Sequence, residues 1–597
     1  MADDPSTRWP ATTIPYAPIR RHAVIGDRRT AALVAADGTI DWMCVPDYDD
    51  EPVFGALLDA ERGGWFRFAP SARVWGRQSY LEDTAVAETR FPVGGGEVVA
   101  HDAMTLPDDT RDSPCADHRV VVRRLRSSVA VRCVLDLRPR PHAVRARVFC
   151  SHAALDGPGP VEFDLRPEED AWAVLAFGDN SSWTAQRARA ALDDTVRRWQ
   201  RWTSRLRYEG SRSRLVRRSL LVVRLLGYAP RGSLVAAPTT SLPERIGGGW
   251  NADYRFAWVR DGSLSLEALA RHGDPRAAER YFDWLAGLGS TTGAPLQVVS
   301  GIDGRTELAQ RELREAPGYR ESSPVRMGNH AYEQKQLGMF GFLADCALAY
   351  RRHGGTWKDE YFELVARAAD YTAQHWDEPD NGIWELPDRR DRVSSRVMSW
   401  VTLARASEIA EEIGRGARAR PWREAMPRVR EQVLSRGYSQ RLGAFRHVLD
   451  QDSVDAAALL IPIFGFLPGD DPRVVSTVDR VARDLTIDGW VHRFVPSEAG
   501  VEPPLPMGEF EGSFVLCTCW LAAAYAIGGR VDRAEAALQK IDAAIGELAL
   551  MPEGIDARSG EFLGNYPLLF SHAEYVRAVV ALDRARRSVV HSGVRSK

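Results

Sequence analysis

Two glutamates lie in segments whose composition restricts their surroundings. Glu385 follows Trp384 at the end of a turn-forming Asp-Asn-Gly-Ile sequence. A carboxyl group beside an indole ring can lose its contact with water, which raises its pKa and keeps it protonated near neutral pH, as a general acid requires. Glu553 stands between Pro552 and Gly554, which restrict the backbone of that loop. Taken singly, each glutamate is more often an ordinary surface residue, so their interpretation depends on the segments around them.

The segment 249–261 combines aromatic and charged side chains in a way that suits a sugar-binding pocket. Flat aromatic rings stack on pyranose faces, and Arg and Asp side chains hydrogen-bond to sugar hydroxyls. The alternative is a core segment with one buried salt bridge, and the segment alone favours neither. Its aromatic and charged residues are Trp250, Asp253, Tyr254, Arg255, Phe256, Trp258, Arg260 and Asp261.

These segments need a framework that holds them together, and the second half of the chain has the pattern of a helical one. From residue 211 onward, apolar residues recur at the i, i+3, i+4 spacing of amphipathic helices. The twelve candidate helices form six hairpins, the number that an (α/α)6 barrel requires. Such a barrel carries its active site on the longer loops at one end, here 236–260, 290–328, 377–391, 437–451, 487–510 and 549–569. The candidate helices are 212–227, 261–272, 275–289, 329–353, 357–376, 392–414, 420–436, 452–465, 471–485, 511–527, 530–548 and 570–587.

Residues from about 20 to 180 have the pattern of an antiparallel β-sandwich. Short runs alternate between apolar and polar residues or are β-branched, and Gly, Pro, Asp and Asn separate them. The region has no βαβ rhythm and no Gly-rich phosphate loop, so a Rossmann or P-loop fold has little support. The clearest candidate strands are 31–35, 72–75, 98–101, 118–125, 129–137 and 144–149.

The pattern changes from β to α near Trp183, which divides the chain into domains. A helix expected at 185–206 would connect them. We predict a multidomain β + α protein with an N-terminal β-sandwich domain over residues 1–183, a helical linker over 184–210, an (α/α)6 barrel over 211–588 that carries the catalytic loops, and a tail over 589–597.

Charge and composition give no support to several classes of function. The net charge of −3 and the pI of about 6.5 offer no electrostatic basis for binding nucleic acid or a membrane surface. We see no signal peptide and no apolar segment long enough to span a membrane, so we expect a cytoplasmic protein. The seven cysteines, including Cys517 and Cys519, lie in no metal-ligand spacing. The sequence therefore implies no metal ion and no organic cofactor, and it leaves the oligomeric state open.

The order of the motifs along the chain resembles glycoside hydrolase family 15, the glucoamylase-like and bacterial trehalase-like inverting α-glucosidases. Each motif alone is weak, but together they follow the order of that family over most of the chain. The matching segments are 25–34, 37–42, 235–244, 253–261, 318–326, 382–385, 511–514 and 564–567.

The resemblance implies catalytic roles for both glutamates. Glu385 matches the general acid and Glu553 the general base of the family. In an inverting mechanism the two carboxyl groups stand roughly 6.5–9.5 Å apart, which leaves room for the attacking water. We expect Trp384 to shield Glu385 and keep it protonated, and we expect Glu553, less shielded beside Gly554, to stay ionised.

The resemblance also implies a substrate-binding set. Arg260 and Asp261 match the pair that holds the hydroxyls of the non-reducing terminal glucose. Arg326 matches a further pocket arginine, and Trp384 a pocket aromatic. The complete predicted substrate-binding set is Trp250, Tyr254, Arg260, Asp261, Arg326 and Trp384.

The chain departs from the family's pattern at several positions. Ala252 replaces an expected indole, while Leu386 and Gly554 replace acidic or polar residues next to the two glutamates. These positions lie on the leaving-group side of the pocket, so the type of reaction is better supported than the identity of the substrate. Glu244 and Glu333, near the predicted site loops, are interpreted as structural residues.

We therefore predict an inverting, exo-acting hydrolase that releases β-D-glucose from the non-reducing end of short, small-molecule α-glucosides. Trehalose, isomaltose and malto-oligosaccharides are all open as substrates. One alternative is a glycoside phosphorylase of similar architecture, which Glu553 disfavours because phosphorolysis needs no base. The other is a non-catalytic carbohydrate-binding protein. The joint presence of both glutamates with Arg260 and Asp261 argues against it.

Overall fold

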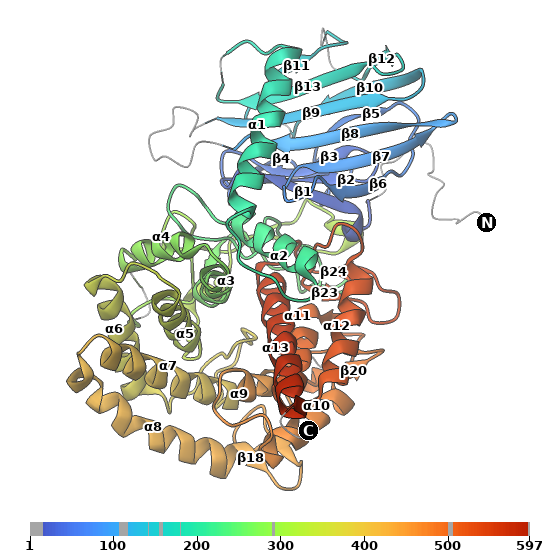
Figure 1. Ribbon diagram of the computed structural model, residues 1–597. Coiled ribbons are helices and arrows are strands. Elements are labelled where there is room, and N and C mark those ends of the chain that lie inside the picture. Colours follow the sequence, from blue (N-terminus) through green and yellow to red (C-terminus); the bar gives the residue numbers. More distant parts are fainter. Residues whose placement is uncertain are drawn as a thin grey trace.

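The chain folds into a β-rich N-terminal region followed by a ring of helices (Figure 1). This computed structural model describes residues 16–106, 118–140, 143–154, 159–179, 181–288, 290, 293–499 and 505–594. The prediction of an antiparallel β-sandwich followed by an (α/α)6 barrel is confirmed. In the described part of the chain, no helix is both long enough and apolar enough to cross a membrane.

Two antiparallel sheets form the N-terminal region, with strand orders β1-β2-β3-β5-β10-β12, where β4 pairs with β3, and β11-β13-β9-β8-β7-β6. In strands with one solvated face, buried and exposed side chains alternate as expected. In β7, for example, Ala87 and Phe91 are buried while Arg90 is exposed. The bounds are β1 His22–Gly26, β2 Ala31–Ala35, β3 Thr39–Cys44, β4 Pro52–Phe54, β5 Trp65–Pro70, β6 Arg77–Tyr80, β7 Ala87–Val93, β8 Gly96–Met104, β9 Arg119–Ser127, β10 Val131–Arg138, β11 Arg147–Cys150, β12 Val161–Leu165 and β13 Asp170–Phe177.

One predicted strand is wrong. Residues 72–75 lie between β5 and β6 and belong to no strand. Val74 is partly buried against the core, and Arg21 lies over the partly buried Trp75 ring at 5.1 Å. Side-chain packing rather than backbone pairing therefore accounts for the alternation that resembled a strand.

Helix α1 (Ala185–Thr203) connects the two regions. The Thr184 side chain caps its N-terminus by accepting a hydrogen bond from the Arg187 amide. Its buried face, which includes Leu192 and Trp199, packs on the sandwich at β8, β9 and β13. At its far end the Trp202 indole donates to Asp274 at 2.8 Å, so the helix also contacts the barrel (Figure 1).

The barrel consists of an inner and an outer ring of helices. Inner helices are buried on all sides, as in α11, whereas outer helices are buried on one stripe, as in α10 with Val474, Val478 and Val481. The inner helices are α3 Val259–Arg271, α5 Met339–Arg352, α7 Val393–Glu412, α9 Leu460–Ile463, α11 Val515–Ile527 and α13 Leu569–Val594. The outer helices are α2 Ser213–Leu225, α4 Pro275–Ala286, α6 Asp359–His375, α8 Arg420–Gln432, α10 Pro472–Asp484 and α12 Val531–Ile545.

Two inner helices, α5 and α9, begin well after their predicted starts at residues 329 and 452. Helix α5 begins at Met339, because the residues before it form a short 3₁₀ helix (His330–Glu333) and then an extended segment. Helix α9 is only one turn long and follows a 3₁₀ turn (Ala456–Leu459). Gly465, with φ of 72°, ends it.

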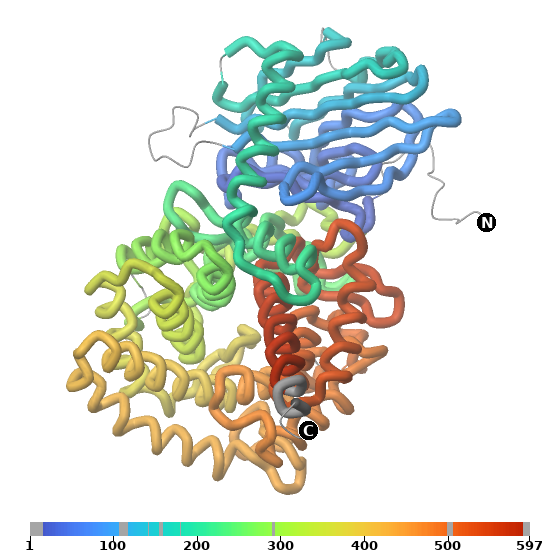
Figure 2. The backbone as a smooth tube through the Cα atoms, viewed as in Figure 1, coloured from blue at the N-terminus to red at the C-terminus, as the bar shows by residue number. Residues whose placement is uncertain are grey.

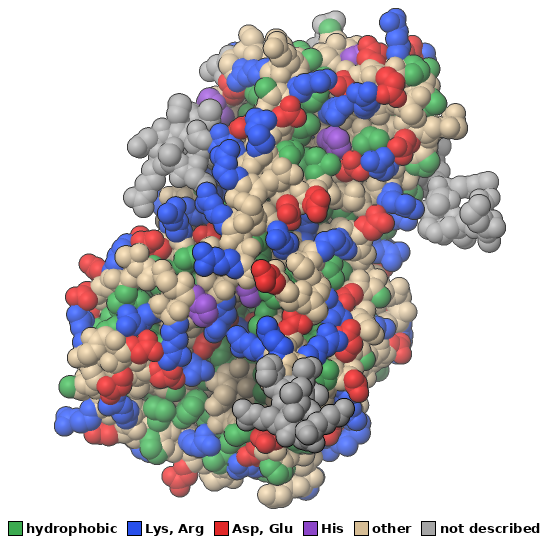
Figure 3. Space-filling view, in the orientation of Figure 1, with side chains coloured by type: hydrophobic (Ala, Val, Ile, Leu, Met, Phe, Trp, Pro, Cys, Tyr) green, Lys and Arg blue, Asp and Glu red, His purple; other side chains and the backbone are tan. Residues whose placement is uncertain are grey.

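The ring closes where α3 packs against α13, so the start and the end of the barrel sequence lie side by side (Figure 2). Acidic and basic side chains are interspersed over the face of the molecule shown in Figure 3. This mixture agrees with the small net charge of −3.

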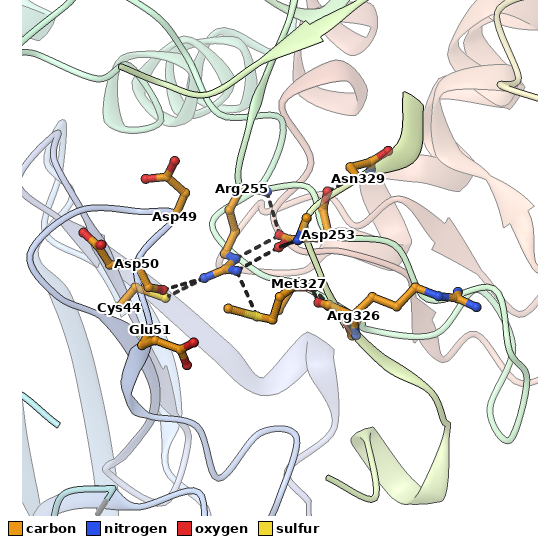
Figure 4. A network of polar contacts seen from close by, with 12 residues as sticks. Cys44, Asp49, Asp50, Glu51, Asp253, Arg255, Arg326, Met327 and Asn329 are labelled. Carbon is orange, nitrogen blue, oxygen red and sulfur yellow. Dashed lines mark hydrogen bonds and ion pairs between the residues drawn. The ribbon is translucent and has the colours of Figure 1, made fainter. Parts of the chain in front are cut away.

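A buried arginine fixes the barrel's entry segment to the sandwich (Figure 4). Arg255 donates to both carboxylate oxygens of Asp253, at 2.9 and 2.8 Å. It also donates to the Asp50 carbonyl at 2.7 Å and to Cys44 Sγ at 3.4 Å, both in the sandwich region. Its other terminal nitrogen lies 3.1 Å from Met327 Sδ. The segment that continues to the predicted sugar-binding residues is thus held from both sides.

Candidate active site

Loops that lead into the inner helices bring the predicted catalytic residues to one end of the barrel. Arg260 and Asp261 lie in the first turn of α3. Glu385 lies in the loop before α7. Glu553 directly precedes strand β23 (Gly554–Ile555), which pairs with β22 (Ser513–Phe514) and β24 (Phe562–Leu563). A small antiparallel sheet therefore positions one glutamate, and a turn before a helix positions the other.

Arg260 joins two of the predicted carboxylates. Its Nε donates to Asp261 Oδ2 at 2.8 Å, and its Nη1 donates to Glu385 Oε1 at 3.1 Å. The guanidinium group also donates to the Ile383 carbonyl and lies 5.3 Å from the Phe570 ring. Since one planar group binds both carboxylates, Asp261 and Glu385 are held in a fixed relation to each other.

The backbone of Glu385 adopts an uncommon conformation that its neighbours hold in place. Its φ is 60°, in the left-handed region. Gln334 Nε2 donates to the Glu385 carbonyl at 2.9 Å, and the indole of Trp258 donates to Glu385 Oε1 at 2.8 Å. Asn381 donates to the carbonyl of Leu386 at 2.8 Å. These bonds from three different segments fix the direction of the Glu385 carboxyl group.

Glu553 is enclosed by the loop that follows it. Its Oε2 accepts a hydrogen bond from the Asn565 amide at 3.0 Å, and its own amide donates to the Asn565 carbonyl at 3.1 Å. Gly564 has φ of 69°, and a Cβ atom there would lie only 2.2 Å from Glu553 Oε2. A glycine is therefore required at position 564 for this carboxylate to occupy its place.

Tyr254 connects the two glutamates electrostatically. Burial raises the pKa of Glu553 to about 7, although hydrogen bonds from Tyr254 and Asn565 act in the opposite direction. Burial also raises the pKa of Tyr254 well above its usual value, and the charges of Glu553, Glu244 and Glu385 raise it further. The Tyr254 hydroxyl thus remains a neutral donor that faces carboxyl groups.

The expectation that Glu553 is less shielded from water than Glu385 is wrong. The Trp384 indole donates to Asp455 Oδ1 at 2.8 Å, and its ring packs against Trp520. The Glu385 side chain is 20% exposed to solvent, whereas Glu553 is only 2% exposed. Burial of Glu553 comes from the β22–β23–β24 sheet, which joins segments distant in the sequence, so its sequence neighbours did not reveal it.

Trp250 and Arg326 lie together near the same end of the barrel. The Trp250 ring packs edge-to-face on Phe510 with centroids 4.9 Å apart. Arg326 Nη1 donates to the Gly249 carbonyl at 2.8 Å, so it braces the segment that carries Trp250. The Arg493 guanidinium lies 5.9 Å from the Trp250 ring and 5.7 Å from the Trp384 ring, which connects the two predicted aromatics.

Sequence reasoning missed several residues of the site. Arg493 lies in the predicted site loop 487–510, but no motif marked it. It forms ion pairs with Glu511 and with Glu244, which had been interpreted as structural. Gln334 was expected in a helical turn, yet it lies in the extended segment that contacts the Glu385 loop. The only available signal was the position of these residues in loops of the same barrel end.

The arrangement offers two carboxyl groups, an arginine–aspartate fork and aromatic rings at one end of the barrel. A carboxyl pair of this kind can supply the proton that a glycosidic leaving group needs and can take a proton from water. The buried Arg260–Asp261 fork can discriminate between sugars, because a substrate without the matching hydroxyl would leave its polar groups unpaired.

Comparisons with known proteins agree with this chemistry. A family model described as glycosyl hydrolases family 15 matches residues 210–580, and one described as trehalase-like, N-terminal matches residues 9–153. The chain is 32% identical to a protein named trehalase from Mycolicibacterium smegmatis, over 99% of this chain and 95% of that protein. It is 30% identical to a trehalase from Thermoplasma volcanium, over 96% of this chain and 94% of the other. A bacterial glucoamylase complexed with acarbose shares the fold, with a TM-score of 0.67 over 96% of both chains at 12% identity.

Proposed function

Since the chain belongs to glycosyl hydrolases family 15 and is a glycoside hydrolase, we propose that it hydrolyses trehalose with inversion at one anomeric carbon. The observation that carries the proposal is the pairing of Glu385 and Glu553 around Tyr254, with Glu385 bound to the guanidinium group that also binds Asp261.

In this proposal the Arg260–Asp261 fork binds hydroxyls of the glucosyl ring that is cleaved. Glu385 gives its proton to the glycosidic oxygen as the bond to the anomeric carbon breaks. Glu553 takes a proton from water, whose oxygen forms the new bond on the opposite face of the ring. A base with a pKa of about 7 suits this step, because it is a stronger base than an ordinary carboxylate and is still substantially ionised near neutral pH.

Trehalose is favoured over the other short α-glucosides by the relatives. The proteins named trehalase match this chain over nearly the full length of both partners. The match to the trehalase-like N-terminal model extends this agreement to the sandwich region. Both rings of trehalose are α-linked, so inversion predicts one β-glucose from the attacked ring and one α-glucose from the leaving ring.

A substrate panel followed by NMR tests the proposal. Trehalose, isomaltose and maltose are incubated with the enzyme, with and without phosphate, and the first anomers of glucose are recorded. We expect trehalose to have the highest kcat/KM and to give both anomers in equal initial amounts. Faster cleavage of isomaltose or maltose would overturn the substrate, α-glucose alone would overturn inversion, and glucose phosphate would overturn hydrolysis.

A further inference from the structure

Next to Glu553 lies a buried cluster of charged groups that the proposed mechanism does not use. It consists of Glu244, Glu511 and Arg493, which are 8%, 3% and 4% exposed. Arg493 Nε donates to Glu511 Oε1 at 3.1 Å, and its Nη2 contacts the other oxygen of Glu511. The same Nη2 donates to Glu244 Oε2 at 2.9 Å. One guanidinium group therefore serves two buried carboxyl groups, with Glu511 held by two contacts and Glu244 by one.

The backbone keeps Glu244 in this position. The Glu244 amide donates to the Trp250 carbonyl at 3.3 Å, and the Gly512 amide donates to the Glu244 carbonyl at 2.8 Å. The preceding carbonyl, of Pro243, accepts from the Gly564 amide, which adjoins the Glu553 carboxylate. Glu244 is thus attached to the segments that carry Trp250, Glu511 and the base.

The charges in this cluster do not balance if every carboxyl group is ionised. Glu244, Glu511 and Glu553 would bring three negative charges against the single positive charge of Arg493. The other titratable groups that face the cluster are Tyr254 and Cys517, both neutral because burial raises their pKa values well above the usual ones, the more distant Glu385, and His492, whose pKa burial lowers to about 4. Buried charges without partners are costly, so the cluster has to bind a proton.

The contacts with Arg493 indicate where that proton lies. Both oxygens of Glu511 contact the guanidinium group, whereas one oxygen of Glu244 does. A pair of charge-assisted contacts favours an ionised carboxyl group more than a single contact does, so Glu244 is the group left to hold the proton.

We propose that Glu244 is a positioning residue that holds a proton, which lets Glu553 remain ionised as the base. The proposal rests on the role given to Glu553 above. Burial raises the pKa of Glu244 well above its usual value, and the neighbouring charge of Glu553 acts in the same direction. If both Glu244 and Glu511 carried a charge, their repulsion would favour the protonated, inactive form of Glu553.

Infrared difference spectroscopy of the resting enzyme at pH 7 tests the protonation directly. A Glu244→Gln variant should lose a carbonyl band of a protonated carboxylic acid. The matched control is Glu267→Gln, since Glu267 is also buried but lies between Arg271 and Arg577 at the other end of α3. Although burial raises the pKa of Glu267, those arginines lower it overall, so the control should lose a carboxylate band. Loss of a carboxylate band in Glu244→Gln would overturn the proposal.

Kinetics supply a second readout. The amide of Glu244→Gln is uncharged like the protonated acid and keeps an oxygen that accepts from Arg493, so kcat/KM should stay within about threefold of wild type and its acid limb should keep its position. Glu244→Met has similar size but cannot accept this bond, and its kcat should fall about tenfold or more. An acid limb that moves to lower pH in Glu244→Gln, or a Gln variant that fails to fold, would show that an ionised Glu244 is needed. The infrared result requires no substrate, so failure of the proposed trehalose activity would be recognised separately.

Discussion

The Glu553 carboxylate lies so close to Gly564 that position 564 has no room for a side chain. A methyl group there would lie 2.2 Å from Glu553 Oε2, and the backbone has φ of 69°. We expect Gly564→Ala to lower kcat by about 10²-fold, because displacement of the base by even 1 Å misaligns the water. The backbone strain should also destabilise the protein by about 1–3 kcal/mol.

Gly560 supplies the matched control for this substitution. It lies in the same loop with φ of 73°, and a Cβ atom there has no neighbour within 4 Å. Gly560→Ala should therefore show the same backbone strain in thermal unfolding but keep its activity in steady-state kinetics. Equal losses of kcat in both variants would mean that loop strain, and not contact with Glu553, decides the outcome.

The two glutamates should respond differently to substrates with good leaving groups. Glu385→Gln removes the proton that the glycosidic oxygen needs, so trehalose cleavage should fall by about 10²–10⁴-fold. Glucosyl fluoride needs little protonation to leave, so this variant should recover much of its rate on that substrate. Glu553→Gln should stay slow on both, because both need an activated water. The reverse pattern in a comparison of initial rates would mean that the acid and base are exchanged.

The pH dependence of activity should reflect the burial of Glu553. With its pKa at about 7, kcat/KM should decline as the pH falls below 7, approaching tenfold per pH unit. A pH profile measured with trehalose checks this limb, and the limb should be absent from the residual activity of Glu553→Gln. An acid limb near pH 4.5 would mean that this carboxyl group is exposed to water when the enzyme works.

The same group gives a stability test with a defined sign. The folded-state pKa of Glu553 lies above the unfolded value of 4.5, so its contribution to stability is complete below pH 4.5 and is lost as the pH rises through about 7. At pH values above 7, Glu553→Gln should therefore raise the unfolding temperature, and the free energy of unfolding should increase by at most about 3 kcal/mol. Below pH 4.5 the substitution should give no such gain. Thermal scans at several pH values measure the difference, and a gain confined to acid pH would contradict it.

At the scale of elements, the regular helices were predictable and the loop geometry was not. Outer helix α10 shows its buried stripe directly in the sequence. The run 329–353 was expected to be one helix, but Asn329 caps a 3₁₀ turn and the helix starts only at Met339. The burial of Glu553 depends on pairing between β22, β23 and β24, which local patterns do not encode.

One hydrogen-bond acceptor, Asp455, attaches the loop that carries Glu385 to the 3₁₀ turn (Ala456–Leu459) before helix α9. Asp455 Oδ1 accepts from the Trp384 indole and from the Ala457 amide, both at 2.8 Å. Asp455→Ala would leave a buried indole donor without an acceptor and remove the cap, at a cost of about 2–4 kcal/mol. We also expect a lower kcat, because Trp384 precedes Glu385.

The control is Asp455→Asn, which keeps an oxygen for both donors. It should lower the stability and kcat less than Asp455→Ala does in unfolding and kinetic assays. If Asp455→Asn costs as much as Asp455→Ala, then the negative charge of Asp455 matters more than these two bonds.

At the scale of the whole molecule, the change from β to α patterns near Trp183 predicted the order of the two regions, but the contacts between them follow only from the structure. Arg255 lies in the segment 249–261, which suits a sugar-binding pocket, although the predicted substrate-binding set does not include it. In the structure it is 1% exposed and bonds to the sandwich at Asp50 and Cys44 (Figure 4). Two arginines of one segment thus have different roles. Arg255 binds the barrel's entry segment to the sandwich, and Arg260 binds Asp261 and Glu385 in the site.

The buried and exposed arginines between the two regions should therefore differ in their effect on stability. Arg255→Ala leaves the Asp253 carboxylate buried without its partner, which typically costs about 3–5 kcal/mol. Because the freed segment leads to Tyr254 and Arg260, activity should fall as well. Arg311 also connects the regions, through Glu51, but these two side chains are 61% and 54% exposed. Arg311→Ala should cost less than about 1 kcal/mol, because water screens exposed ion pairs. Differential scanning calorimetry with parallel activity assays distinguishes them: we expect Arg255→Ala to lower the first unfolding transition and Arg311→Ala to leave it nearly in place. Similar shifts in both variants would show that the interface is held by its apolar contacts rather than by the buried arginine.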